Sequence, residues 1–368
     1  LNLNETASFV ENRTLAEVPE YTREALFTGD YFSEWETFFT DHAAARNTLI
    51  KLNAWTELKL LHLPVVNDIV VTDDCLLTFN KFGRWDTQYL DDGSKKMSDD
   101  LQSLSKYIAE RGGSFFYVGV PTQISFFSDK YPNYLESASW IFDKTYSIFG
   151  KDLSDKNVNY VDMDKKFRDL NYPEKMYAAT DHHYSYFGAY ETYRQTMEQI
   201  NEKTGKNLKI YTLEDYTLSE LPNRFIGSRE RKLYGLSGVE DKFTIGNMKD
   251  PIKFTRIDNG TLTNAPICAM PKTASEPVTY EIYMGGDVAE TIINTDRPEL
   301  PNVLIYGDSF TNAIETFMYA SFNEMRSLDF RHYTAKSLRE YIDEYRPDIV
   351  ICVRDSNNYL TDTGNGQT

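Results

Sequence analysis

The sequence has few cysteines and no long apolar run. Its three cysteines, Cys75, Cys268 and Cys352, lie far apart among 368 residues and form no C-x-x-C pair. Neither a zinc pattern nor a disulfide framework is therefore encoded. No segment approaches 18 uninterrupted apolar residues, and no signal peptide is recognisable, so the sequence predicts no transmembrane helix. Because the chain opens at Leu1 without methionine, we expect an export or anchor segment upstream of it.

Basic residues are too few for binding of nucleic acid. Lysine and arginine number 39 against 56 acidic residues, which gives a formal net charge of −17, and the longest basic run is 229–232. A protein that binds phosphate backbones needs a basic surface, so nucleic acid is excluded as a partner. The hydrophobic content of 41% is enough for a full core, and the length fits one large domain or two ordinary ones.

Helical and strand patterns alternate along most of the chain. Strands are predicted at 69–77, 114–120, 158–161, 303–306, 324–328 and 348–353, and helices at 34–61, 98–111 (capped by Ser98), 138–149, 186–200, 312–320 and 335–345. This β-α-β order is typical of an α/β fold with a parallel sheet flanked by helices. Residues 208–297 depart from it, because short alternating segments and many turn residues predict a β-rich insertion. We expect an extended arm and helices packing on the core over 1–66, followed by one domain over 67–368.

Ser309 is a candidate nucleophile because of its place between a strand and a helix. Gly307 ends the predicted strand 303–306, and helical spacing begins near Asn312. A serine in this turn points into the crevice above the sheet, where free N–H groups of the helix can hold an oxyanion. A G-D-S tripeptide arises by chance in roughly one chain in ten of this length. The alternative is a turn serine beside a capping Asp308, so the assignment depends on a base.

Two of the five histidines, His182 and His183, follow Asp181 directly. Asp181 can accept a hydrogen bond from Nδ1 of His183, which leaves Nε2 free to take the proton of a serine hydroxyl. Two alternatives stay open. Asp181 or Thr180 could cap the helix that starts near residue 186, or the histidine pair could ligate a metal. Because no second histidine or cysteine cluster exists, we predict no metal site.

The segment 177–184, Y-A-A-T-D-H-H-Y, resembles the DHHW motif of alginate O-acetyltransferase-like proteins, a branch of the SGNH hydrolase superfamily. The G-D-S-F at 307–310 resembles the nucleophile block of that family, and segments 11–15, 41–46, 118–123, 131–135 and 329–333 resemble further parts of it. The resemblance implies an SGNH hydrolase-like parallel sheet in circularly permuted order, because Asp181 and His183 precede Ser309. It departs from the family at Tyr184, where the motif has tryptophan, and at Thr122-Gln123, where relatives often carry a lysine.

The same resemblance suggests residues beyond the triad. Gly307, Asn294, Arg331, Tyr177 and Gln123 stand in or near matching segments and are candidates for an oxyanion hole or for substrate binding. Their roles are the least constrained of the predictions, since no motif places the oxyanion donors.

The activity implied by the resemblance is O-acetyl transfer to an exported or cell-surface polysaccharide, without a cofactor. Ser309 would carry the acetyl group, supplied by a membrane-bound acyltransferase partner, on the extracytoplasmic side. Two alternatives are kept. Water as acceptor would make the protein a carbohydrate acetylesterase, and loss of catalysis would leave a glycan-binding or scaffold protein.

Overall fold

The computed structural model describes residues 1–368 except 12, 80–86, 172 and 367–368. Its main feature is an eight-stranded sheet with the order β10-β9-β11-β13-β12-β14-β5-β6. The five strands from β13 to β6 are parallel, and β11, β9 and β10 continue the sheet in antiparallel pairs. This sheet confirms the predicted fold class. Its strands are β5 (Ser114–Val120), β6 (Asn159–Asp162), β9 (Thr255–Asp258), β10 (Thr261–Thr263), β11 (Glu290–Asn294), β12 (Val303–Gly307), β13 (Glu324–Leu328) and β14 (Ile349–Asp355).

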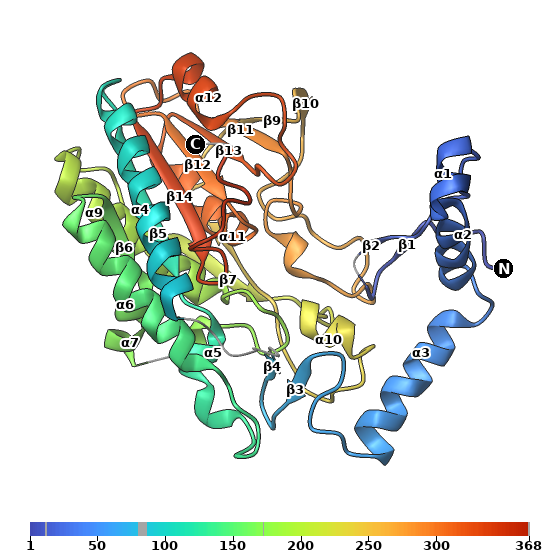
Figure 1. Ribbon diagram of the computed structural model, residues 1–368. Helices are drawn as coiled ribbons and strands as arrows, with labels where there is room; N and C mark the ends of the chain where they lie inside the picture. Colours follow the sequence, from blue (N-terminus) through green and yellow to red (C-terminus); the bar gives the residue numbers. More distant parts are fainter. Residues whose placement is uncertain (12, 80–86, 172, 367–368) are drawn as a thin grey trace.

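Helices flank the parallel strands, and they explain why the two central strands β12 and β14 are buried throughout. Every residue of β12 and of β14 is buried, as expected for strands covered on both faces. Helix α4 packs against α6, and α9 packs against α11 (Figure 1). The helices of this domain are α4 (Thr87–Ala109), α5 (Gln123–Phe126), α6 (Ser139–Asp155), α7 (Met163–Leu170), α8 (Pro173–Met176), α9 (Tyr186–Thr204), α10 (Ser228–Lys232), α11 (Phe310–Met318) and α12 (Leu338–Tyr345).

Two predicted elements differ from the structure. The strand expected over 69–77 is a hairpin of β3 (Ile69–Val71) and β4 (Leu76–Thr78), because Thr72 and Cys75 close a turn between them. Ser98 does not cap a helix, since α4 already runs from Thr87. Its hydroxyl is buried in mid-helix, where it donates to the carbonyl of Lys95 and contacts the Lys156 ammonium at 2.5 Å.

The segment 208–297 is rich in short strands, as predicted. Strands β7 (Tyr216–Glu220) and β8 (Thr244–Met248) form an antiparallel ribbon. The later strands β9, β10 and β11 extend the main sheet from the edge of β13. The segment therefore both adds to the sheet and supplies loops beside it.

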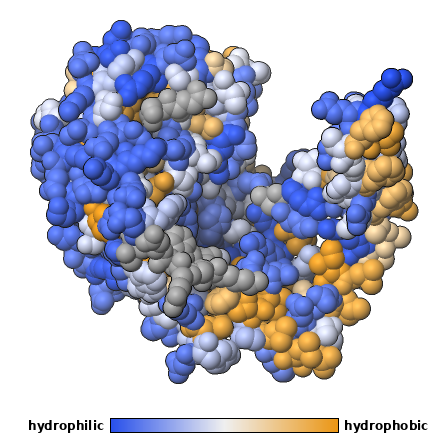
Figure 2. All heavy atoms as spheres, in the orientation of Figure 1, coloured by the Kyte–Doolittle hydropathy of each residue, from blue (hydrophilic) through white to orange (hydrophobic). Residues whose placement is uncertain are grey.

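The N-terminal region lies to one side of the sheet domain (Figure 1). It consists of a short ribbon, β1 (Ala7–Ser8) with β2 (Arg13–Thr14), and of α1 (Arg23–Thr28), α2 (Asp30–Asp41), α3 (Arg46–Trp55) and the π-helical turn Thr56–Leu60. Large apolar side chains are exposed on these helices, and Figure 2 shows them as a continuous hydrophobic surface. Within the described ranges, no helix combines the length and apolar character needed to cross a bilayer. The division into units at residues 66 and 67 stays a prediction.

Candidate active site

The nucleophile loop lies at the carboxyl end of β12, where the sequence predicted it. Strand β12 ends at Gly307 and α11 begins at Phe310, so Ser309 occupies the turn between them. Gly307 is required for close packing, because a Cβ atom at this position would lie 1.9 Å from the carbonyl oxygen of Val353 in β14. Its role is therefore to bring the two strand ends together beneath Ser309.

Asp308 fixes the shape of this loop with its side chain. One carboxylate oxygen accepts the Phe310 N–H at 3.0 Å, and the other accepts the Asp355 N–H at 3.0 Å and the Asn358 amide at 3.1 Å. These three hydrogen bonds join the start of α11 to the end of β14. The loop that carries Ser309 is thus held by two parallel strands at once.

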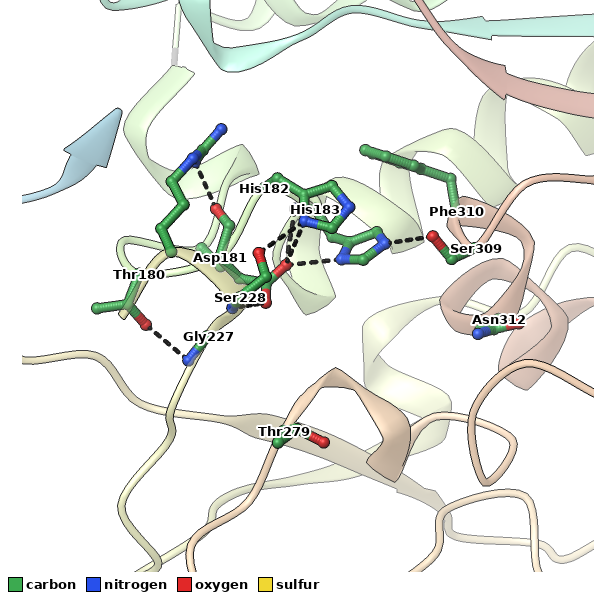
Figure 3. A network of polar contacts seen from close by, with 12 residues as sticks. Thr180, Asp181, His182, His183, Gly227, Ser228, Thr279, Ser309, Phe310 and Asn312 are labelled. Atoms are coloured by element: carbon green, nitrogen blue, oxygen red, sulfur yellow. Dashed lines mark hydrogen bonds and ion pairs between the residues drawn. The ribbon is translucent and has the colours of Figure 1, made fainter. Parts of the chain in front are cut away.

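The structure brings Asp181, His183 and Ser309 into one hydrogen-bonded chain (Figure 3). Nε2 of His183 lies 2.7 Å from Oγ of Ser309, and Nδ1 of the same ring lies 2.6 Å from Oδ1 of Asp181. Both contacts are within normal hydrogen-bond distance. This is the arrangement in which a carboxylate orients an imidazole that can deprotonate a serine.

Asp181 is buried and accepts several hydrogen bonds. Besides Nδ1, Oδ1 accepts the backbone N–H of His183 at 3.0 Å, and Oδ2 accepts the backbone N–H of Ser228 at 2.6 Å. Burial by itself favours the neutral acid, but the charge and hydrogen bonds of His183 outweigh it and hold the pKa of Asp181 well below its usual range. The carboxyl group is therefore an anion that can stabilise a protonated His183.

The alternative in which Asp181 or Thr180 caps the following helix is wrong. Ser185 is the N-cap of α9, and its hydroxyl accepts the N–H groups of Phe187 and Gly188. Thr180 is used differently, because its N–H and hydroxyl both donate to the carboxylate of Asp241, at 2.7 and 3.0 Å. The loop before α9 is thus free to point Asp181 at His183.

Arg229 is a site residue whose place in the sequence indicated only that it belongs to a basic run. Its guanidinium is buried and donates to the carbonyl of Asp181 at 2.7 Å, to Oγ1 of Thr78 at 3.0 Å and to Oε1 of Gln123. Gln123 in turn donates to the carbonyl of Ala178 at 2.7 Å. Arg229 and Gln123 therefore hold the loop 178–181 in place through hydrogen bonds to its backbone carbonyls. Gln123 thus supports the site indirectly, through this loop.

Tyr280 was not predicted to be a site residue, because nothing in the sequence distinguishes it from the other 25 tyrosines. It begins the 3-10 turn Tyr280–Ile282 in the β-rich segment. Its ring lies parallel to that of His183, with a centroid distance of 3.7 Å and an angle of 3°. Phe310 contacts the same imidazole at 4.8 Å. The two rings restrict rotation of His183 and keep Nε2 directed at Ser309.

Three remaining candidates lie away from the nucleophile or contact it only indirectly. Tyr177 is a core residue, because its hydroxyl donates to the carbonyl of Pro121 and its ring is buried. Asn294 pairs with Glu324 at the start of β13, so the structure does not bring it to the carboxyl edge of the sheet that holds Ser309. Arg331 is linked to the site through the carboxylate of Asp287.

Asp287 connects Arg331 to the first turn of α11. The Arg331 guanidinium donates to Asp287 at 2.9 Å, and the Asn312 amide donates to the other carboxylate oxygen of Asp287 at 2.8 Å. Arg331 also pairs with Asp329. Asn312 is near Ser309 in Figure 3. Arg331 thus orients Asn312 through a carboxylate and is not itself at the nucleophile.

The backbone N–H of Ser309 is available for an oxyanion. Among the described residues none accepts a hydrogen bond from it, whereas the N–H of Phe310 is used by Asp308 and that of Thr311 by the Asp308 carbonyl. It stands at the amino end of α11, where partial positive charge collects. The backbone N–H of Ser309 is therefore a candidate donor for an oxyanion hole.

Among the residues that the structure describes, two groups of side chains could offer ligands to a metal ion. Asp181, His182 and His183 have ligand atoms within 4.8 Å of one another, as do Asp287, Asp329 and His332. In the first group both nitrogens of His183 already bond, to Asp181 and to Ser309. In the second, Arg331 binds both carboxylates. Metal binding at either place would have to break these contacts, so a hydrogen-bonded relay fits the first group better.

A cavity of about 270 Å³ borders the triad segments, because its lining includes Phe310, which follows Ser309, and His182, which precedes His183. Its lining consists of Thr78, Thr122, Ile124, His182, Arg229, Phe310, Asp355 and Asn357. Burial, together with the neighbouring Asp308 carboxylate, raises the pKa of Asp355 to about 7. The cavity therefore has room for a small acyl group beside the loop that carries Ser309, and it contains a carboxyl group whose pKa is raised by burial.

Residues 82–227 match the family model described as the SGNH hydrolase-like domain of the acetyltransferase AlgX. Over this range the chain is similar to an SGNH hydrolase-like domain. The match confirms the resemblance expected from the sequence, and it contains Asp181 and His183, while Ser309 follows outside the matched range. No curated protein sequence matches the chain.

Two kinds of solved structure share its fold. Bacillus cereus PatB1 with a sulfonyl adduct superposes with a TM-score of 0.67 at 22% identity, covering 82% of this chain and 98% of PatB1. A DHHW family protein from Eubacterium siraeum DSM 15702 gives a TM-score of 0.58 at 19% identity, covering 82% of this chain and 95% of that protein. At these identities the likeness establishes the fold, and the chemistry must be argued from the site.

Proposed function

We propose that this protein is an O-acetyltransferase that acetylates a polysaccharide through an acetyl-enzyme on Ser309. The observation that carries the proposal is the continuous relay from Asp181 through His183 to Ser309, with contacts of 2.6 and 2.7 Å. The match to an acetyltransferase family over 82–227 supports acetyl as the transferred group. A scaffold protein would not need the three side chains in hydrogen-bond register at the edge of a parallel sheet.

The first half-reaction loads the enzyme. Nε2 of His183 takes the proton of Ser309 as Oγ attacks the carbonyl carbon of the acetyl donor. The developing oxyanion accepts a hydrogen bond from the backbone N–H of Ser309 at the start of α11. The bond to the leaving group then breaks, and the protonated His183 returns its proton to that group. Asp181 stays ionised throughout and stabilises the imidazolium.

The second half-reaction uses the same residues in reverse. A sugar hydroxyl gives its proton to His183 and attacks the acetyl carbonyl, and the ester bond to Ser309 breaks as the serine recovers a proton. Water can attack in the same way, so transfer requires that a sugar hydroxyl be held in attack geometry, where effective molarity can reach roughly 10⁵ M. Whether sugar or water accepts the acetyl group separates a transferase from an acetylesterase.

The proposed function also implies a cellular location and a partner protein. The matched family model is that of an acetyltransferase, AlgX. We propose that the acceptor is an exported or cell-surface polysaccharide and that the reaction takes place on the extracytoplasmic side. We propose a membrane-bound acyltransferase as the partner that supplies acetyl.

The triad is tested by replacing Ser309 and His183 with alanine. Hydrolysis of p-nitrophenyl acetate should fall roughly 10³-fold or more in each variant, because the residues act as one unit. A sulfonyl fluoride should label the wild-type protein and fail to label Ser309→Ala. Ser219→Ala, at an exposed position in β7, is the matched control and should behave as wild type. Full turnover in Ser309→Ala would leave the scaffold alternative.

Transfer is tested by adding oligosaccharides to the acetylated protein and measuring their mass. We expect acetylated oligosaccharide, together with slow release of acetate when no acceptor is present. Rapid hydrolysis, with no acetyl on any neutral or anionic acceptor, would replace the transferase by the acetylesterase.

A further inference from the structure

A second and larger cavity adjoins the catalytic one. Its volume is about 610 Å³, within the range of sites that enclose a ligand of moderate size. Both cavities are lined by Thr78, His182 and Arg229, so these three residues form their common boundary. The catalytic cavity holds less than half of this volume. A bulky reactant that approaches Ser309 therefore has its space on the far side of His182.

Three segments distant in sequence build the larger cavity. The N-terminal ribbon contributes Val10 and Glu11, the β3 region contributes residues 67–69, and residues 228–234 supply the wall that continues from the triad. Glu11 is held in place by the Arg46 guanidinium, at 2.8 and 2.9 Å. The N-terminal arm, which lies to one side of the sheet, therefore closes a space that opens toward the nucleophile.

His182 is the residue at the boundary that is best placed to meet a reactant. Its Nδ1 lies 2.7 Å from Oγ of Ser228, whose backbone N–H binds Asp181. Its ring lies 3.8 Å from that of His183 (Figure 3), and 44% of its side chain is exposed. Across the described ranges no protein atom hydrogen-bonds Nε2 of His182. This nitrogen is therefore an uncommitted polar group beside the catalytic base.

The rest of the lining suits a sugar. Asn67 donates through Nδ2 to the carbonyl of Lys232, which leaves its Oδ1 for a ligand, and Ser228 offers a hydroxyl. Tyr234 adds an aromatic side chain, and aromatic rings pack on the apolar faces of sugars while their hydroxyl groups bond nearby. Hydroxyl, amide and imidazole groups beside one aromatic ring match the mixed surface of a pyranose.

We propose that this cavity is the acceptor subsite, where one sugar residue of the polysaccharide lies against Tyr234 and Asn67 while Nε2 of His182 orients the hydroxyl that attacks the acetyl-enzyme. The inference rests on the proposed function and extends it, because it names where the acceptor binds and makes His182 a positioning residue. In this arrangement His183 still takes the proton of the acceptor hydroxyl. His182 holds the oxygen atom of that hydroxyl in position.

Binding is tested separately from catalysis. In Ser309→Ala protein, which cannot form an acetyl-enzyme, cellohexaose and hexagalacturonate are titrated by calorimetry. We expect at least one of them to bind, and we expect Tyr234→Ala to raise its Kd about tenfold, as loss of one good contact does. Tyr134→Ala, at a side chain that is 75% exposed elsewhere, is the matched control. Tyr234→Phe, which keeps the ring, should bind as wild type and shows that the fold tolerates change here.

Positioning is tested in the active protein. His182→Ala should lower the ratio of transfer to hydrolysis about tenfold or more, because the acceptor oxygen loses its orientation. His182→Gln, whose side-chain amide can still reach the acceptor hydroxyl, should recover part of this ratio. The rate at which p-nitrophenyl acetate acetylates Ser309 depends on His183 but needs no sugar acceptor. It therefore measures the catalytic base separately from acceptor positioning.

The outcomes separate the two proposals. If Tyr234→Ala leaves Kd unchanged, or if His182→Ala lowers acetylation and transfer by the same factor, the cavity is not the acceptor subsite, while transfer by wild-type protein would still support the enzyme. If the sugar binds through Tyr234 but is never acetylated, the subsite stands and the transferase assignment fails.

Discussion

Helix α11 and the N-terminal helices differ in how they are stabilised. All nine residues of α11 are buried, whereas α1 buries none, α2 buries Phe38 and Asp41, and α3 buries Ala54. Large apolar side chains of the N-terminal helices are exposed instead (Figure 2), among them Phe27, Phe32, Phe39, Leu49, Leu52 and Trp55. Tertiary packing therefore fixes α11, while the N-terminal helices rely on local hydrogen bonds and a few polar contacts.

The difference in packing separates the catalytic residues from the second cavity. The nucleophile and its base come from elements with dense nonlocal packing, which holds them in position. The second cavity is bounded by the weakly packed arm, whose ribbon is tied to α2 and α3 by Asp41 and by Arg46. Changes in the sheet domain should therefore affect stability and catalysis together, and changes in the arm should affect mainly the cavity it closes.

The largest effect is expected from Phe317→Ala. Phe317 is 1% exposed, stacks on Tyr193 at 5.5 Å and contacts Tyr186 and Tyr216. Removing a buried phenyl ring leaves a cavity and should lower the free energy of unfolding by about 3–5 kcal/mol. Urea denaturation measures this change. A loss below about 1 kcal/mol would show that α11 is not fixed by packing.

The pH dependence should have opposite signs in the two regions. The pKa of Asp355 in the sheet domain is raised to about 7, above its unfolded value near 3.9, so the folded protein binds more protons between these values. Its contribution to the free energy of unfolding should then fall as pH rises from 4 to 7, by up to about 1.4 kcal/mol per pH unit. Denaturation at pH 5 and 7 checks this, because Asp355→Asn should lose less stability over the interval than wild type.

Asp41 in the arm should behave in the opposite way. It is buried, accepts two hydrogen bonds from Arg13 and one from the N–H of Ala16, and these hold its pKa far below the usual range. Its stabilisation is present above the unfolded pKa and lost as pH falls. Asp41→Asn should weaken attachment of the ribbon by roughly 1–3 kcal/mol. Limited proteolysis of residues 1–22 should accelerate, while Glu24→Gln, an exposed control, should not change it.

The smallest effect is expected from Phe27→Ser. Phe27 is 87% exposed, and α1 has no buried residue. Its replacement should change the free energy of unfolding by no more than about 0.5 kcal/mol. A change as large as that of Phe317→Ala, measured by the same denaturation, would mean that the arm contributes to the core and would remove the contrast drawn above.

Local patterns were enough to locate most elements of the sheet. The ranges predicted at 114–120 and 324–328 coincide with β5 and β13, and 303–306 falls one residue short of β12. Strands of this kind are recognisable because they are short, apolar and bounded by turn residues. The hairpin of β3 and β4 was predicted as a single strand, because only a short polar turn separates its two apolar segments.

The sequence by itself determined the α/β class, the turn that carries Ser309 and the pairing of Asp181 with His183, because each depends on residues within a few positions of one another. Only the tertiary structure decided that His183 meets Ser309, that Tyr280 stacks on the imidazole and that Arg229 supports the loop of Asp181. It also placed Asn294 at the opposite edge of the sheet from Ser309. These relations depend on strand order and on which strand ends share an edge. Sequence periodicity reports which face a residue occupies, but it contains no information about which distant segment lies opposite.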